Sequence, residues 1–216
     1  FFTMRLLSML SATELGGDRG VDGYTDFDWV SVERRFPAPA IEIAGREGWA
    51  FWELPTESDR RAEIDALRLL AVFLAHWDNK ADNQRLVCLD GDVSGGRCER
   101  PVLMLQDVGA TFGPAKANLA RWQDLPVWTD RRTCQVGMTG LPSHGATFPE
   151  VHVSEAGRLL LPRRLALLSD RDIRELFASA RFPAFYAGTD DERDLASWTA
   201  AFRQRVDQIA SAGPCP

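Results

Sequence analysis

The chain has 216 residues, of which 45% are hydrophobic and 26% charged, and its formal net charge at pH 7 is −6. A chain of this length and composition can bury a real core, in one moderately large domain or in two small lobes. No basic tract or basic helix face offsets the negative charge, so we expect no binding to nucleic acid. No apolar run reaches the roughly 18 residues that a membrane-spanning helix needs, so no membrane span is predicted.

The N-terminal stretch is apolar, starts with Phe rather than Met, and lacks both the basic leader and the cleavage site of a signal peptide. We therefore expect a fragment or a processed chain. A short helix is predicted over residues 1–13. Alternating polar and apolar residues predict strands over 29–36, 40–45 and 48–54.

A largely buried helix is predicted from Ser58, as its N-cap, to about residue 77. Its apolar residues recur at helical spacing, at Ile64, Leu67, Leu70, Ala71 and Leu74, and Val72 and Phe73 widen the apolar stripe.

Two apolar strands, 84–89 and 101–107, are joined by a glycine-rich turn and predict a hairpin. Residues 111–157 carry no periodic pattern and are expected to be irregular. Two further helices are predicted over 169–182, capped by Ser169, and over 191–211. The second has an apolar face formed by Leu195, Trp198, Phe202, Val206 and Ile209. Because strands and helices fall into separate runs, the pattern favours an α+β fold rather than alternating βαβ units.

The four cysteines are Cys88, Cys98, Cys134 and Cys215, and none of them forms a CxxC pair, so a zinc site is not expected. Cys88 and Cys98 flank the turn of the predicted hairpin. Two interpretations remain open for this pair. A disulfide would indicate a secreted or periplasmic protein, whereas two buried thiols would fit a soluble cytoplasmic one.

A polar cluster, "HWDNKADN" at residues 76–83, interrupts the apolar pattern between the buried helix and the hairpin. If the hairpin is antiparallel, Asn83 at the start of its first strand comes close to Asp107 at the end of its second. Amide and carboxylate oxygens are ligands that suit Mg²⁺. Asp78 is free to accept a proton, and Lys80 offers a point charge for a phosphate oxygen.

The octapeptide resembles the protein-kinase catalytic loop H-R-D-x-K-x-x-N, and "DVG" at residues 107–109 looks like the D-F-G metal motif. The pair is also similar to motifs of atypical and lipid kinases. This resemblance implies that Asp78 is the catalytic base and that Lys80 contacts the transferring phosphate. Asn83 and Asp107 would hold Mg²⁺ or Mn²⁺, and Gly109 would complete the ATP-binding motif.

The same resemblance implies a mainly helical kinase-like C-lobe over residues 56–216, preceded by a partial β-rich N-lobe over 1–55. No glycine-rich phosphate loop or strand lysine precedes residue 50, so the rest of an N-lobe lies upstream or the fold is a degraded kinase. Trp77 replaces the arginine that receives a phosphate in kinases switched by activation-loop phosphorylation. We therefore expect no such switch here.

The leading hypothesis is thus a kinase-like phosphotransferase that moves the γ-phosphoryl group of ATP to a hydroxyl acceptor. Two alternatives stay open: a metal-dependent phosphoester hydrolase using Asp78, Asp82 and Asp107, and a non-catalytic binding domain derived from a kinase. The Asx residues of the cluster could instead simply cap turns. The sequence specifies neither the acceptor nor the oligomeric state.

Other polar and aromatic side chains are expected to have structural or substrate-binding roles. His76 is expected to be packed rather than catalytic, and His144 and His152 to have surface or fold roles. The tryptophans and arginines of the irregular segment could contribute to substrate binding. Trp122 and Trp128 could line an acceptor groove, and Arg131 and Arg132 could meet an acidic substrate.

Overall fold

The computed structural model describes residues 18–19, 25–26, 37–42, 45–46, 48–90, 98–113, 117–142, 145–180 and 195–216. Contacts between Cα atoms divide the chain into two units, Phe1–Pro39 and Ala40–Pro216. The sequence prediction set its boundary later, after residue 55.

The described residues of the first unit include a short antiparallel pair, β1 (Asp18–Arg19) with β2 (Thr25–Asp26). The helix predicted over residues 1–13 and the strand predicted over 29–36 lie outside the described residues.

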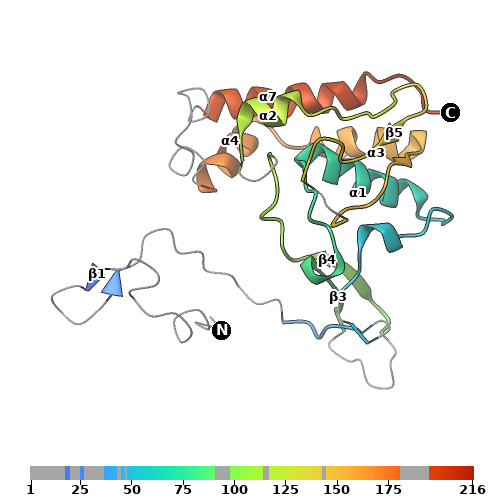
Figure 1. Cartoon of the computed structure of the whole chain (residues 1–216), viewed down its shortest axis with the longest axis vertical. Helices are drawn as coiled ribbons and strands as arrows, with labels where there is room; N and C mark the ends of the chain where they lie inside the picture. The colour runs from blue at the N-terminus through green and yellow to red at the C-terminus, as the bar shows by residue number, and fades with distance from the viewer. Residues whose placement is uncertain are drawn as a thin grey trace. The chain divides into compact units, whose positions relative to one another are not determined.

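The second unit is a mixed α+β structure, which confirms the predicted fold class at this level (Figure 1). Its described helices are α1 (Arg61–Leu74), α2 (Leu119–Asp124), α3 (Glu155–Leu165), α4 (Asp170–Ser179) and α7 (Leu195–Ala210). Its strands form two antiparallel pairs, β3 (Gln84–Cys88) with β4 (Pro101–Leu105) and β5 (Gln135–Val136) with β6 (Val151–His152). None of the described helices combines the length and the apolar character that crossing a bilayer requires.

Helix α1 occupies the predicted position and is buried along most of its length. Its N-cap residue is Arg60 rather than Ser58, so the predicted cap was wrong. The Ser58 hydroxyl accepts a hydrogen bond from the Arg60 N–H, and the Ser58 carbonyl accepts one from Arg61, which forms a turn before the helix. The helix ends at Ala75, whose left-handed backbone (φ 56°) turns the chain into the polar cluster.

Helix α3 was not predicted, because Pro162 lies inside it and obscures the helical pattern. Ser154 caps its start, accepting a hydrogen bond from the Gly157 N–H at 3.3 Å. Gly157 lies against α1, and a Cβ added to it would come within 2.5 Å of the Asp65 Cβ. The missing side chain lets α1 and α3 pack closely, as the neighbouring ribbons in Figure 1 show.

Helix α4 begins at the predicted cap, where the Ser169 hydroxyl accepts a hydrogen bond from the Asp172 N–H. Helix α7 presents the predicted apolar face to the core. Aromatic rings from distant segments meet there in edge-on and stacked contacts, namely Phe73, Phe112, Trp122, Phe177, Trp198 and Phe202.

Arg205 of α7 is fully buried in this core. Its guanidinium donates to the carbonyl oxygens of Val72 and Phe73, at the end of α1, and of Trp122 and Leu125, at the end of α2. Carbonyl groups at helix C-termini lack partners within the helix and carry partial negative charge. A single cation therefore joins three helices.

The strand predicted over 48–54 was wrong, since Phe51–Glu53 form a 3₁₀ turn. Trp49, Ala50 and Phe51 are buried in succession, whereas a half-buried strand would alternate. The Glu53 carboxylate accepts a hydrogen bond from the Ala50 N–H at 2.7 Å, which closes the turn. Of the strand predicted over 40–45, the described part makes one isolated bridge, between Ala40 and Val87.

The segment 111–157 is less irregular than predicted, because it contains α2 and the β5–β6 pair. Two disulfides are present, Cys88–Cys98 and Cys134–Cys215. The first agrees with one of the two interpretations of the hairpin cysteines, and the second was not predicted.

Candidate functional site

The β3–β4 hairpin brings the two halves of the candidate site together. Its strands pair in antiparallel register, with Gln84 opposite Leu105. Asn83 therefore precedes the first strand at the point where Asp107 follows the second. The Asn83 carbonyl accepts hydrogen bonds from the backbone N–H groups of Gln106 (3.1 Å) and Asp107 (3.0 Å). The expected convergence of these two segments is thus present in the backbone.

The side chain of Asn83 turns back onto the loop that precedes it. Its Nδ2 donates to the Asp78 carbonyl at 2.8 Å, and its backbone N–H donates to the Lys80 carbonyl at 3.1 Å. These bonds fold residues 78–83 into a compact loop, within which Ala81–Asn83 form a 3₁₀ turn. The amide nitrogen is a donor only, so the oxygen Oδ1, which this bond leaves unused, is the atom of this group that can bind a cation.

Asp78 and Lys80 form an ion pair within this loop. The Lys80 Nζ lies 3.1 Å from Asp78 Oδ1, with 41% of the lysine side chain and 25% of the aspartate side chain exposed. At such partly exposed positions the pair contributes little to stability. Each side chain keeps part of its surface exposed and orients the other, although Asp78 Oδ1 itself is buried.

Asp107 is exposed, and its Oδ1 accepts a hydrogen bond from the Gly109 N–H at 2.9 Å. This Asx turn sets the direction of the chain after the strand. Phe112 lies three residues after Gly109. Its N–H donates to the Leu74 carbonyl at 2.7 Å, and its ring enters the aromatic core. Backbone hydrogen bonds thus hold the segment 107–112 at both ends, at Asp107 and at Phe112, and the Asp107 carboxylate faces solvent.

His76 lies buried beneath the loop, as predicted for a packed residue. Burial lowers the pKa of its imidazole, while the Ala110 backbone and the negative charges of Asp78 and Asp107 act in the opposite direction. A neutral ring at this position supports both the loop and the turn after β4. The lowered pKa favours the uncharged ring, which adds no positive charge that would repel a cation nearby.

Asn79 is a structural member of the site that sequence reasoning did not single out. It is fully buried, and its Nδ2 donates to the His76 carbonyl (2.9 Å) and to the Thr147 hydroxyl (2.8 Å). Its backbone N–H donates to the Ala146 carbonyl at 2.9 Å. Since Thr147 lies 68 residues away, no local pattern could have indicated this tie.

Asp82 is exposed, and its backbone carbonyl accepts a hydrogen bond from Arg85. It takes part in none of the hydrogen bonds that join Asn83 to Asp78 and Asp107. Among the described residues, one group of His, Cys, Asp or Glu side chains has the spacing of a metal site: Cys88, Asp90 and Cys98. Its two sulfur atoms form the disulfide, so they cannot act as thiolate ligands.

The acceptor groove suggested for Trp122 was wrong, because its ring is fully buried in the aromatic core. Trp128 is half-buried and donates to the Gln208 carbonyl at 3.4 Å. Arg131 donates to the carbonyls of Ser211 and Ala212 near the C-terminus rather than projecting freely toward a substrate. His152 is exposed, and its Nδ1 lies 3.0 Å from the Thr133 carbonyl.

His144 lies outside the described residues. Comparisons of the chain with protein-family models, with curated proteins and with solved structures found no match.

Proposed function

We propose that the chain is a kinase-like phosphotransferase that moves the γ-phosphoryl group of ATP to a hydroxyl acceptor with the help of Mg²⁺. The observation that carries the proposal is the hydrogen-bonded junction of Asn83 with Asp78 on one side and with Asp107 on the other. Two motif residues of one loop, Asp78 and Asn83, thereby share a junction with Asp107, which lies after the hairpin, and a phosphotransfer site requires such convergence.

The oxygen donors of this junction fit a hard divalent cation. Asn83 Oδ1 is not used by the contact with Asp78, and the exposed Asp107 carboxylate retains lone pairs beyond its bond to Gly109. Bound Mg²⁺ would neutralise charge on the phosphates of ATP, and Asn83 and Asp107 would be its protein ligands. A chain with a net charge of −6 needs such a cation to accommodate a polyphosphate.

Asp78 is the proposed base that orients and deprotonates the acceptor hydroxyl. Its backbone carbonyl is held by Asn83, and its carboxylate is paired with Lys80, so its direction is defined before an acceptor binds. Lys80 is proposed to contact the transferring phosphate, since its side chain is 41% exposed and its ammonium group lies beside that carboxylate. Gly109 is proposed to keep the Asp107 turn free of a side chain.

The two disulfides favour an oxidising compartment for the protein, outside the cytoplasm. Cys134–Cys215 joins residues 81 positions apart, so it constrains a large part of the chain.

Substitution of Asp107 by Ala tests the assignment, because this exposed side chain bonds only its own turn among the described hydrogen bonds. We expect the wild type to be stabilised against heat by ATP with Mg²⁺ and Asp107→Ala to lose that stabilisation while remaining folded. The matched control Asp207→Ala removes an exposed carboxylate from α7 and should respond to Mg²⁺-ATP as the wild type does.

The same thermal series separates the alternatives. Stabilisation by Mg²⁺ alone would favour the hydrolase, and stabilisation by neither ligand would favour a binding domain. Nucleotide binding that persists unchanged in Asp107→Ala would remove the phosphotransferase assignment.

A further inference from the structure

Asn79 directly follows Asp78, the proposed base, and is fully buried. Its backbone N–H donates to the Ala146 carbonyl at 2.9 Å, and its Nδ2 donates to the Thr147 hydroxyl at 2.8 Å. Its carbonyl accepts a hydrogen bond from the Phe51 N–H at 3.3 Å. Two segments from other parts of the chain therefore hold the residue next to the base.

Phe148 supports the same loop through aromatic contacts. Its ring stacks on the Phe51 ring, with the two centroids 5.9 Å apart, and the Phe51 ring meets the His76 imidazole edge-on at 6.1 Å. All three rings are buried. His76 lies two residues before the proposed base, and Asn79 lies one residue after it. The segment 146–148 therefore supports the loop on both sides of that base.

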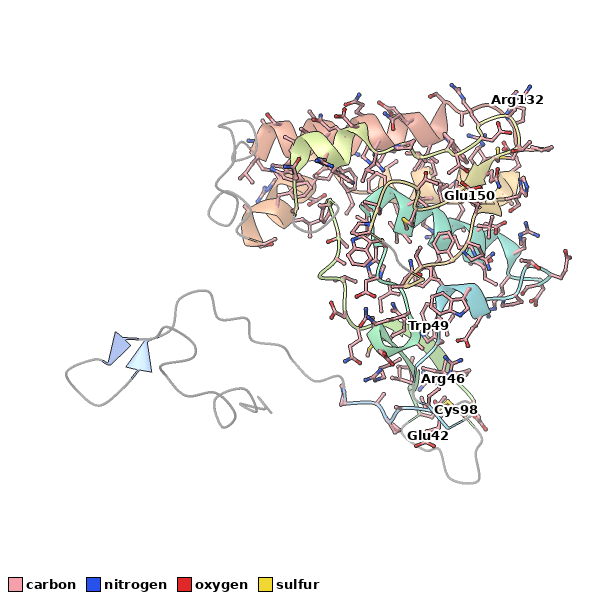
Figure 2. All side chains as sticks on the ribbon, viewed as in Figure 1. Glu42, Arg46, Trp49, Cys98, Arg132 and Glu150 are labelled. Carbon is pink, nitrogen blue, oxygen red and sulfur yellow. A yellow bond between two sulfur atoms is a disulfide. The ribbon has the colours of Figure 1, made fainter. Side chains whose placement is uncertain are left out.

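The segment 146–148 is anchored by the strand pair that follows it. Strand β6 pairs with β5, and Glu150 accepts a hydrogen bond from the Gln135 Nε2 at 3.2 Å. Figure 2 shows Glu150 between Arg132, at one end of this unit, and Arg46, at the other. The contact with the loop thus comes from a part of the chain that is fixed by contacts of its own.

The orientation of Asp78 depends on that of Asn79, because the two residues share one peptide plane. A base acts efficiently only while its carboxylate points at the proton that it accepts. Misplacement of a reacting group by about 1 Å can lower a rate by about 100-fold. The proposed metal ligands Asn83 and Asp107 are joined through the Asn83 carbonyl, without Thr147. Loss of the Thr147 contact should therefore affect the chemical step more than the binding of nucleotide.

We propose that Thr147 is a positioning residue of the phosphotransfer site, whose hydroxyl holds Asp78 in its catalytic orientation through Asn79. This role rests on the proposed phosphotransferase function. The hydrogen bond between Thr147 and Asn79 does not rest on it, and the effect of that bond on the loop can be measured without nucleotide.

Thr147→Val tests the role, because valine keeps the branched shape of threonine and lacks the hydroxyl. The assay is Mg²⁺-dependent ATP turnover by the full chain, with water as the acceptor. In this reaction the water oxygen bonds to the γ-phosphorus, the bond to ADP breaks, and the water proton passes to Asp78. We expect kcat to fall by about tenfold or more and KM for ATP to stay within about twofold of the wild type.

Thr147→Ser keeps the hydroxyl, so its kcat should stay within about threefold of the wild type. Thr147→Ala removes the hydroxyl with a smaller side chain and should lower kcat as Thr147→Val does. A dependence on the hydroxyl rather than on side-chain volume separates the hydrogen bond from packing.

Thr199→Val is the matched control. Thr199 is 6% exposed, and its hydroxyl donates to the Leu195 carbonyl at 2.7 Å within α7. The control and Thr147→Val each lose one hydroxyl hydrogen bond through the same chemical change, so both should lower the midpoint of thermal unfolding by a similar amount. Only Thr147→Val should lower kcat.

Hydrogen exchange without nucleotide measures the effect on the loop itself. The Asn79 N–H is protected by its bond to the Ala146 carbonyl. Amides of residues 76–83 should exchange about fivefold faster or more in Thr147→Val than in the wild type or in Thr199→Val.

An unchanged kcat in Thr147→Val, with an active wild type, would overturn the positioning role and leave the proposed function standing. Equal losses of kcat in Thr147→Val and Thr199→Val would overturn it too, as would unchanged exchange of the loop in Thr147→Val. Faster exchange of the loop, with no ATP turnover by the wild type, would overturn the positioning role together with the proposed function.

Discussion

The side-chain amide of Asn83 donates a 2.8 Å hydrogen bond to the backbone carbonyl of Asp78, five residues earlier in the chain. This contact determines which end of the amide faces the loop and leaves Oδ1 as the atom to which we assign the proposed contact with Mg²⁺. The Asn83 backbone carbonyl meanwhile accepts the N–H groups of Gln106 and Asp107. One residue thus shapes the loop that holds the proposed base and joins it to the proposed metal carboxylate.

Replacing Asn83 by Asp should abolish function while leaving the fold nearly intact. An aspartate keeps oxygen ligands but loses the donor, so it faces the Asp78 carbonyl with a repelling oxygen. We expect Mg²⁺-dependent ATP turnover to fall by about 100-fold or more and the free energy of unfolding by only about 1 kcal/mol. ATP turnover and urea unfolding of the same preparation measure the two effects.

Asn118→Ala is the control, because it should lower the free energy of unfolding by about as much as the replacement of Asn83 does. Asn118 caps α2 by accepting the Arg121 N–H at 2.8 Å, and loss of such a cap costs about 1 kcal/mol. ATP turnover should be unchanged in this variant. A similar loss of turnover in both variants would attribute the Asn83 effect to stability alone.

Arg205→Lys should destabilise the protein by about 3 kcal/mol or more. Burial lowers the pKa of Arg205 to about 10, so the group is still charged at pH 7 and depends on its four carbonyl partners. A lysine ammonium cannot span carbonyls at the ends of two helices. Urea unfolding monitored by tryptophan fluorescence measures the loss.

Arg203→Lys, two residues away on the same helix, is the comparison for Arg205. Arg203 pairs with the exposed Asp170 at 2.7 Å, so its replacement should cost below about 1 kcal/mol. Equal losses for the two variants would contradict the proposed role of the buried carbonyl cluster.

Removing the Cys134–Cys215 disulfide should destabilise the chain more than removing Cys88–Cys98. The two bonds join residues separated by 81 and 10 positions, and the chain-entropy model gives a difference of roughly 2 kcal/mol. Double Cys→Ser variants of each pair, unfolded without reductant, measure the order. In the wild type, thiol titration after denaturation without reductant should find no reactive thiol.

At acidic pH, the change of the free energy of unfolding with pH should depend on Glu155. Its carboxylate accepts two hydrogen bonds from Arg158 and one from the Cys215 N–H, which lower its pKa from 4.5 to about 2. Since folding favours the ionised form, the contribution to stability is complete above pH 4.5 and is lost as the pH falls toward 2.

Glu155→Gln tests this dependence through the free energy of unfolding measured between pH 2 and pH 6. The variant should be less stable than the wild type near pH 6, and the two curves should converge as the pH falls. Parallel curves over this range would show that the carboxylate charge does not contribute.

Features encoded over a few residues were predictable from the sequence. The Ser169 cap, the apolar face of α7 and the β3–β4 hairpin follow from local patterns, and the hairpin implies that Asn83 and Asp107 approach each other. Local patterns gave wrong predictions where the buried residues did not alternate as they do in a half-buried strand, or where a proline lay within a helix. Residues 48–54 form a turn, and Pro162 obscured α3.

The sequence by itself determined which residues carry candidate chemistry and their order along the chain. Only the tertiary structure decided the long-range contacts of the fold, namely the Asn79–Thr147 hydrogen bond, the carbonyl partners of the buried Arg205 and the Cys134–Cys215 bond. The two residues in each contact lie far apart in sequence, and the fold decides which of them meet. A buried donor or acceptor needs a partner wherever the chain places one, so no pattern of neighbouring residues encodes that choice.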